Sequence, residues 1–376
     1  MKEELQGKTV FLLADFSLPF GRIAPTLKKL LDSGAKVVIG AFHPDPAPWG
    51  GVHEDSLEPY ARKFADFLGR KFIALSPEQS LPDYAVPHLF FLKHEIGKHD
   101  VRDVIGRMHA RDLAVLERLN NYNETAAAEI PKFSNLFVHD DFGHESALVS
   151  SLGNFLPPKA GLAAAETRKK LESFIRVAKH PFVMVLGGVN LAGKEQALSV
   201  LFKKADKILI GGALANLFLS AKGYPIGKSI VDKKVQQKIV KAWLRDYAAK
   251  IVLPTDVIVS PDPQTRGECV SIAKVKAHHM ILDIGPATIL NFSREIKKAK
   301  TLLWSGPLGY VESRNFSAGT EALLRLFAAR TGRPKAAAVA GGGKTMALAT
   351  IWGLADFLDH VHSKGSAMLN FLAKLK

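Results

Sequence analysis

Residues 181–188 read PFVMVLGG, in which five apolar residues are closed by Gly187 and Gly188. A short apolar run bounded by turn residues is typical of a strand buried on both faces of a parallel sheet. Similar runs follow at 207–210, 251–253, 281–284, 301–304 and 336–340, and several end in glycine, at Gly211-Gly212, Gly285, Gly306 and Gly341-Gly342-Gly343. Glycine allows tight turns and close approach of the backbone to a ligand, and open α/β sheets bind ligands at the carboxyl ends of their strands. The recurrence predicts a nucleotide-type lobe.

The first half of the chain shows the same alternation of strands and helices. A strand at Thr9–Leu13, a helix at Thr26–Ser33 ended by Gly34, and a strand at Ala35–Ala41 form a predicted βαβ unit. Further predicted elements are a helix from Ser56 to near Gly69 and strands at 72–75, 89–92 and 136–138. Alternating strands and helices predict a parallel α/β lobe.

The length of 376 residues favours two domains. We predict an α/β fold with two doubly wound parallel-sheet lobes joined by a helix. The predicted parts are an N-terminal lobe (1–158), a connector helix (159–178), a C-terminal nucleotide-type lobe (179–358) and a shortened C-terminal segment (359–376).

Composition narrows the class of protein. Hydrophobic residues make up 47% and charged residues 23%, which are values of an ordinary globular protein. The single cysteine, Cys269, cannot form an internal disulfide, and the histidine pairs lack a coherent third and fourth ligand, so we predict no metal site. No signal peptide or membrane span is predicted. We therefore expect a cytoplasmic, monomeric protein that does not associate with a membrane.

The net charge of +15 is concentrated in one segment. Residues 166–250 hold 17 Lys or Arg against 6 Asp or Glu, a net +11. Such an excess favours polyanions, including RNA, although a solvated basic helical surface explains it equally simply.

Eight ordered segments carry a resemblance to a known family. They are ADFSLP (14–19), HDDFG (139–143), PFVMVLGG (181–188), ILIGGALANLFLSAKGYPIGKSIV (208–231), LPTDVIV (253–259), DIGPAT (283–288), WSGPLGYVE (304–312) and GGGKT (341–345). In these segments the chain resembles phosphoglycerate kinase, a two-lobed enzyme that exchanges a phosphoryl group between 1,3-bisphosphoglycerate and ADP. The resemblance covers nearly the whole chain.

The resemblance implies an ADP or ATP site in the second lobe. The residues that it assigns to nucleotide binding are Gly187, Gly188, Lys194, Gly211, Gly212, Pro307, Glu312, Gly341, Gly342, Gly343 and Lys344. Glu312 stands where the family uses a glutamate on the nucleotide ribose. Asn190 replaces one of the family's two phosphate-facing lysines, whereas Lys194 remains.

Lys344 occupies the place of the family aspartate that holds the nucleotide's magnesium. We therefore expect no protein-held magnesium ion. Lys344 follows three glycines at a predicted helix N-terminus, where backbone N–H groups and the helix dipole favour an anion. Our hypothesis is that its ammonium contacts a phosphate directly, and the alternative is a solvated lysine.

In the first lobe, the resemblance implies that the basic patch for phosphoglycerate is largely missing. The family's Arg-x-Asp-x-Asn pattern reads Leu13, Asp15, Ser17, which leaves Asp15 and Ser17 as remnants of substrate binding. Arg22 is the one candidate for the catalytic arginine. Asp45 stands where a cation is expected, and Ser146 and Ala147 replace a His-Arg pair.

Three functions remain open on these residues. The leading prediction is a phosphoglycerate-kinase-like protein that is catalytically impaired and still binds ADP or ATP. The alternatives are a divergent active phosphoglycerate kinase, a phosphotransferase with a carboxyl group as acceptor, and a basic scaffold that binds RNA or another polyanion. Losing several preorganised charges predicts a large loss of rate, because one such donor is worth roughly 10²–10³.

Overall fold

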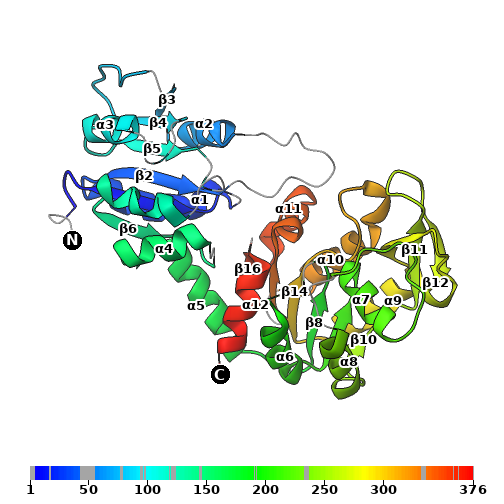
Figure 1. Cartoon of the computed structure of the whole chain (residues 1–376). Helices are drawn as coiled ribbons and strands as arrows, with labels where there is room; N and C mark the ends of the chain where they lie inside the picture. The colour runs from blue at the N-terminus through cyan, green and yellow to red at the C-terminus, as the bar shows by residue number, and fades with distance from the viewer. Residues whose placement is uncertain are drawn as a thin grey trace. The chain divides into compact units, whose positions relative to one another are not determined.

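The computed structural model describes residues 5–16, 18–42, 56–76, 79–93, 96, 99–117, 119, 124–143, 146–189, 191, 193–232, 237–331, 336–358, 360–362 and 364–375. The described residues before Lys170 form one compact unit, and those from Lys170 onward form a second (Figure 1). We call them the first and second units. No helix in the described part of the chain is long and apolar enough to cross a membrane.

The first unit is built on a seven-stranded parallel sheet in the order β3-β4-β5-β2-β1-β6-β7. Its elements are β1 (Thr9–Ala14), α1 (Phe20–Asp32), β2 (Lys36–Ala41), α2 (Glu58–Phe67), β3 (Lys71–Leu75), β4 (His88–Leu92), α3 (His99–Arg107), β5 (Leu113–Leu116), η2 (Glu124–Ala128), η3 (Ile130–Lys132), β6 (Leu136–His139), α4 (Ala147–Phe155), β7 (Lys159–Ala160) and α5 (Leu162–Arg176), whose last turns belong to the second unit.

Side chains of β1 alternate between two hydrophobic cores. Val10 and Leu12 belong to the core that includes residues of α1 and α2, whereas Phe11 and Leu13 belong to the core on the other face, which includes residues of α3 and α4. All four are at most 1% exposed. Because helices cover both faces of a parallel sheet, its strands are apolar without interruption.

Several elements of the first unit differ from the sequence-based prediction, among them α1, β5 and the strand β7, which lies within the predicted connector helix 159–178. Helix α1 begins at Phe20, six residues before Thr26. The sequence pattern did not show its first turns, because Pro25 disfavours a helix interior and Ile23 is the one residue among 20–25 that is buried. Strand β5 was not predicted, since Leu113–Leu116 stands between Asp112 and Glu117 and no glycine or proline marks either of its ends.

The second unit holds a six-stranded parallel sheet, β10-β9-β8-β14-β15-β16, and a three-stranded sheet, β12-β11-β13. Its elements are β8 (Phe182–Leu186), α6 (Glu195–Lys204), β9 (Lys207–Ile210), α7 (Gly212–Ala221), α8 (Gln237–Asp246), β10 (Ile251–Val252), β11 (Asp256–Ser260), β12 (Glu268–Ser271), η4 (Ile272–Lys274), β13 (Met280–Ile284), α9 (Pro286–Lys298), β14 (Thr301–Ser305), η5 (Arg314–Phe316), α10 (Ala318–Ala329), β15 (Ala337–Gly341), α11 (Gly343–Ile351), η6 (Ala355–Phe357), β16 (His360–His362) and α12 (Gly365–Lys374).

The two large parallel sheets confirm the predicted α/β class, with one correction. The apolar run at 281–284 is in β13, which pairs antiparallel with β11 in the small sheet. Gly285 therefore does not follow a strand of the parallel sheet. An apolar run of this length does not show the direction of its partner strand, which only the pairing decides.

The end of β6 is joined to the start of α5 by a buried carboxylate. Asp140 Oδ1 accepts a hydrogen bond from Ala164 N at 3.0 Å, and Thr26 Oγ1 accepts one from Leu162 N at 2.8 Å. These acceptors satisfy N–H groups that the first turn of a helix leaves without an intrahelical partner. Burial raises the pKa of Asp140, while Thr26 and the N–H groups of Ala164 and Ala163 oppose that shift. Asp140 thus caps α5.

Replacing the capping carboxylate should destabilise the first unit. We expect Asp140→Ala to lower the free energy of unfolding by about 1–2 kcal/mol, the usual worth of an N-terminal cap. Urea unfolding followed by circular dichroism measures this. The matched control is Asp103→Ala, which removes an exposed carboxylate that pairs with Arg107 four residues along α3. Equal stability of the two variants would contradict the capping role.

Candidate functional site

The predicted glycines of the second unit meet at one edge of the six-stranded sheet. Strands β9, β8, β14 and β15 are consecutive neighbours, and Leu186 is in register with Ile210 and with Ser305, which is itself in register with Gly341. All four strands are parallel, so their carboxyl ends lie at the same level. The glycines that follow these ends therefore gather at the edge where open α/β sheets bind ligands.

Backbone groups of these turns pack directly against one another. Gly188 N donates to Pro307 O at 2.7 Å, and Gly212 N donates to Leu308 O at 2.8 Å. A Cβ atom at Gly187 would lie 2.1 Å from Pro307 O, a distance that no side chain tolerates. The glycines are needed because backbone touches backbone here. We call the turns at 187–188, 211–212, 306–307 and 341–342 the glycine edge.

Three helices begin next to the glycine edge. Helix α6 starts at Glu195, α7 at Gly212 and α11 at Gly343, and the residue before α11, Gly342, has φ 115°, which disfavours any other residue. The N-terminus of a helix presents unpaired N–H groups and the positive end of its dipole. The edge therefore offers several donors to a polyanionic ligand.

Lys344 and Glu312 contact each other at this edge. Lys344 Nζ donates to Glu312 Oε1, and both side chains are about four-tenths exposed, at 41% and 38%. Lys344 is the second residue of α11, and Glu312 lies in the segment that follows β14. The two side chains that the sequence assigned to the phosphates and to the ribose are thus paired with each other.

Lys194 lies beside Asp232, directly before α6. Asp232 Oδ2 accepts a hydrogen bond from Leu191 N at 2.9 Å, which holds the loop that carries Lys194. Burial lowers the pKa of Lys194, and Asp232 and Glu195 partly oppose that shift by attraction. Lys194 is half-buried, and its ammonium is a point charge of the kind that binds phosphates. Its predicted phosphate contact stays a prediction.

A buried acid supports the segment that carries Glu312. Asp283, 2% exposed, accepts hydrogen bonds from Gly319 N and Ile284 N, each at 2.8 Å. A Cβ atom at Gly309 would lie 2.5 Å from Asp283 Oδ1, so the 308–312 segment runs directly over the carboxyl. Burial raises the pKa of Asp283 to about 7, and the two N–H groups partly oppose this.

In the first unit, the structure describes two of the predicted substrate and catalytic residues, Asp15 and Arg22. Asp15 follows β1 and is 6% exposed. Arg22, on α1, forms an ion pair with Glu166 of α5 at 3.7 Å. Ser146 serves as the N-cap of α4, because its Oγ accepts a hydrogen bond from Val149 N at 3.2 Å. Ser17, Asp45 and Asn190 lie outside the described residues.

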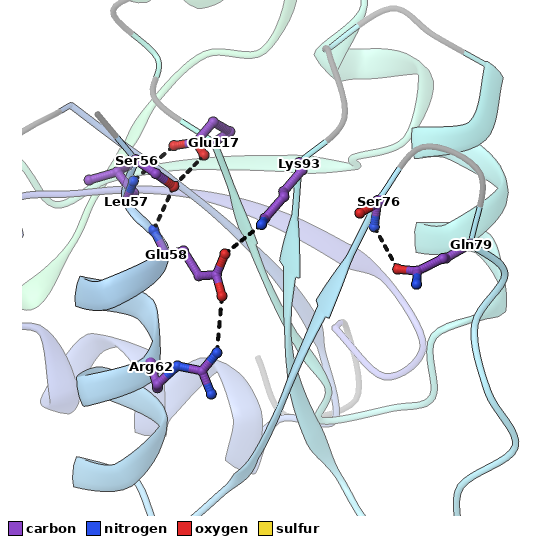
Figure 2. A network of polar contacts seen from close by, with 8 residues as sticks. All are labelled: Ser56, Leu57, Glu58, Arg62, Ser76, Gln79, Lys93 and Glu117. Carbon is purple, nitrogen blue, oxygen red and sulfur yellow. Dashed lines mark hydrogen bonds and ion pairs between the residues drawn. The ribbon is translucent and has the colours of Figure 1, made fainter. Parts of the chain in front are cut away.

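Two carboxylates that the sequence analysis missed lie at the carboxyl ends of β4 and β5 (Figure 2). Glu117, directly after β5, accepts hydrogen bonds from Ser56 Oγ at 2.6 Å and from Leu57 N at 2.9 Å, just before α2. Glu58, the first residue of α2, pairs with Lys93 at 2.7 Å and with Arg62 at 3.0 Å. These acids occupy donors and cations that could otherwise bind an anion. No periodicity or spacing in the sequence points to them.

Comparisons with known proteins match almost the whole chain to one family. The phosphoglycerate kinase family model matches residues 2–374. A phosphoglycerate kinase of Pelotomaculum thermopropionicum is 30% identical over 98% of this chain and 94% of its own. That of Chloroherpeton thalassium is 32% identical over 97% and 94%.

The chain belongs to the phosphoglycerate kinase family. The crystal structure of phosphoglycerate kinase from Pyrococcus horikoshii is similar in fold, with a TM-score of 0.73 at 24% identity over 99% of this chain and 95% of that one. The structure of the Coxiella burnetii phosphoglycerate kinase has a TM-score of 0.66, also at 24% identity. The predicted family and fold are thereby confirmed.

Phosphoglycerate kinases use ADP or ATP with magnesium. We therefore ask whether the residues of the glycine edge fit a nucleotide phosphate and a magnesium ion. The starts of α7 and α11 at this edge present backbone N–H groups and the positive ends of their helix dipoles, which fit a phosphate group. For the metal, the described residues contain no group of three or more His, Cys, Asp or Glu side chains placed to hold an ion. Glu312, from the segment after β14, reaches the start of α11, where its carboxylate contacts Lys344.

Two lysines of the basic segment (residues 166–250) donate hydrogen bonds to carbonyl groups at the C-terminal ends of helices in this phosphoglycerate kinase fold. Lys250 Nζ donates to the carbonyls of Phe202 and Lys203 at the end of α6, and Lys204 Nζ donates to Leu375 O beyond α12. A cation at a helix C-terminus satisfies unpaired carbonyls and complements the dipole. These charges therefore have a structural role within the chain.

The close packing of Gly187 against the carbonyl oxygen of Pro307 can be tested by substitution. We expect Gly187→Ala to lower the free energy of unfolding by about 2 kcal/mol or more, because its Cβ would collide with a backbone oxygen that cannot move alone. The control is Gly21→Ala in α1, where nothing lies within 4 Å of the added Cβ. Thermal unfolding of both variants checks the difference, and an unchanged Gly187→Ala protein would refute the packing argument.

The buried acid should make stability depend on pH. The pKa of Asp283 is higher in the folded than in the unfolded chain, so the folded state retains a proton that the unfolded state releases above pH ~4. The free energy of unfolding should therefore fall by up to roughly 4 kcal/mol as pH rises from about 4 to about 7, since each pKa unit is worth ~1.4 kcal/mol. Above pH 7 this contribution should be constant.

Urea unfolding between pH 5 and 8 measures this slope. Asp283→Asn should flatten it, because the amide does not titrate. Asp246→Asn, at an exposed acid whose pKa Arg245 lowers, should leave the slope unchanged in this range. Equal slopes for wild type and Asp283→Asn would show that the carboxyl is ionised throughout.

Proposed function

We propose that the second unit binds ADP or ATP at the glycine edge, and that the chain transfers the phosphoryl group between 1,3-bisphosphoglycerate and ADP slowly. The observation that carries nucleotide binding is the meeting of four glycine turns and the starts of α6, α7 and α11 at one sheet edge. Such an edge favours a polyphosphate through backbone donors and helix dipoles. Lys194 and Lys344 add positive charge on either side of it.

Slow transfer is supported by the partners of the charged side chains. Arg22 pairs with Glu166, Lys93 pairs with Glu58, and Glu117 accepts the hydrogen bonds offered just before α2. A multiply charged phosphoglycerate needs cations and donors that are free to contact it. Lys344, an ammonium, cannot serve as a metal ligand in the way a carboxylate does.

The second candidate is an ordinary phosphoglycerate kinase. It is favoured by the family match over residues 2–374 and by relatives at 30–32% identity that the chain covers over 94% of their length. On this alternative, Asp15 and Arg22 would act in substrate binding and catalysis after a rearrangement of their partners. The turnover number separates the two candidates.

Calorimetry and a coupled assay test the proposal together. We expect ADP to bind the full chain with little dependence on magnesium, and Lys344→Ala to weaken binding about tenfold. Lys298→Ala, at an exposed lysine that pairs with Glu295, is the control and should bind like wild type. With saturating 1,3-bisphosphoglycerate and ADP, we expect turnover below ~1 s⁻¹, the lower end of ordinary enzymes.

Faster turnover with a strict magnesium requirement would favour the ordinary kinase. Absence of ADP binding would refute the nucleotide site. The predicted cytoplasmic location, monomeric state and polyanion or RNA partner for residues 166–250 stay predictions. The ammonium groups of Lys204 and Lys250 in that segment already donate to backbone carbonyls, so a polyanion would have to compete with these contacts.

A further inference from the structure

The contact between Lys344 and Glu312 joins two neighbouring strands of the sheet. Lys344 follows β15 and Glu312 follows β14, and these strands pair from Thr301 to Ser305. The two side chains are 32 residues apart in sequence. They meet because the turns after adjacent parallel strands lie at the same edge.

This pair is poorly suited to stabilising the fold. Both side chains are about four-tenths exposed, and an exposed ion pair contributes only about 0–1 kcal/mol. Their surroundings instead favour an anion, because Lys344 stands in the first turn of α11, at the positive end of the helix dipole. Glu312 supplies that anion from within the chain.

A second observation at the same helix start points to a missing partner. Thr345, the next residue of α11, is fully buried, and its Oγ1 has no hydrogen-bond partner in the described structure. A Cβ atom at Gly342 would lie 3.6 Å from this oxygen. A buried hydroxyl without a partner costs free energy, and the polar groups at this turn are therefore incompletely satisfied by the chain alone.

We propose that Glu312 is a built-in counter-anion for Lys344, and that a nucleotide polyphosphate must displace its carboxylate to reach the start of α11. The inference rests on the proposed nucleotide binding. It gives Glu312 a competitive role in the nucleotide-free chain, distinct from the ribose contact that the family resemblance predicts. Glu312 then sets the affinity of the site for polyphosphates.

The two roles of Glu312 predict different effects of the same substitution on the affinity for a ligand without ribose. If Glu312 only contacts the ribose, Glu312→Gln weakens ADP and leaves a ligand without ribose unaffected. If Glu312 competes with phosphate, the same variant binds such a ligand more tightly, because Lys344 is released and a repelling charge is removed. Inorganic tripolyphosphate has the phosphates without the ribose and isolates the competition.

Calorimetric titration of tripolyphosphate and ADP into the full chain at low salt tests the proposal. We expect Glu312→Gln to bind tripolyphosphate about threefold to tenfold more tightly than wild type, a range set by an exposed ion pair and a removed repulsion. The gain should disappear in the Lys344→Ala background and shrink with added salt. The matched control is Glu321→Gln, which breaks the exposed Glu321–Arg325 pair on α10 at 2.8 Å and should not change binding.

Each outcome decides between the proposals. Equal or weaker tripolyphosphate binding by Glu312→Gln overturns the counter-anion role while leaving ADP binding intact. A gain that persists without Lys344 also overturns it, because the competition would then not act through that ammonium. If neither wild type nor any variant binds ADP or tripolyphosphate, the proposed nucleotide site itself fails. Unchanged thermal unfolding of the variants confirms that the comparison is between folded proteins.

Discussion

Backbone contact between the turns at Gly187-Gly188 and Gly306-Pro307 is the constraint on which the second unit depends. Gly188 N donates to Pro307 O at 2.7 Å, and Gly187 leaves no room for a Cβ atom beside that same oxygen. This approach holds the carboxyl ends of β8 and β14 together at the centre of the sheet. The start of α11, Lys344 and the segment that carries Glu312 are all positioned from this edge, and Asp283 supports that segment from below the surface.

Charge is arranged differently in the two units. The edge of the second unit combines helix N-termini with Lys194 and Lys344, each accompanied by a carboxylate that partly balances it. At the carboxyl ends of β4 and β5 in the first unit, Glu58 and Glu117 take up the available cation and donors. The family's chemistry needs a polyanion in each half. In this chain the second unit presents backbone donors at the start of α11, and the first unit holds internal polar contacts at the carboxyl ends of β4 and β5.

Individual strands show how much of the fold could be predicted from the sequence. Phe182–Leu186 and Lys207–Ile210 were predicted with the bounds that the structure has, because their apolar runs are uninterrupted and end at glycine. Leu113–Leu116 was missed because charged residues flank it and no glycine or proline marks its ends. The run at 281–284 was predicted as a strand, but its antiparallel partner β11 places it in a separate sheet, which hydrophobicity does not encode.

The family, the α/β class and the residues of the glycine edge could all be predicted from the amino-acid sequence. Local runs, turn residues and ordered motifs carry this information, because each depends on neighbouring residues along the chain. The tertiary structure alone decided that Lys344 meets Glu312, that Arg22 meets Glu166 and that Glu117 lies at the start of α2. These partners are 32, 144 and 60 residues apart. Strand order and the packing of helices bring them together, and no local pattern specifies which charges will pair.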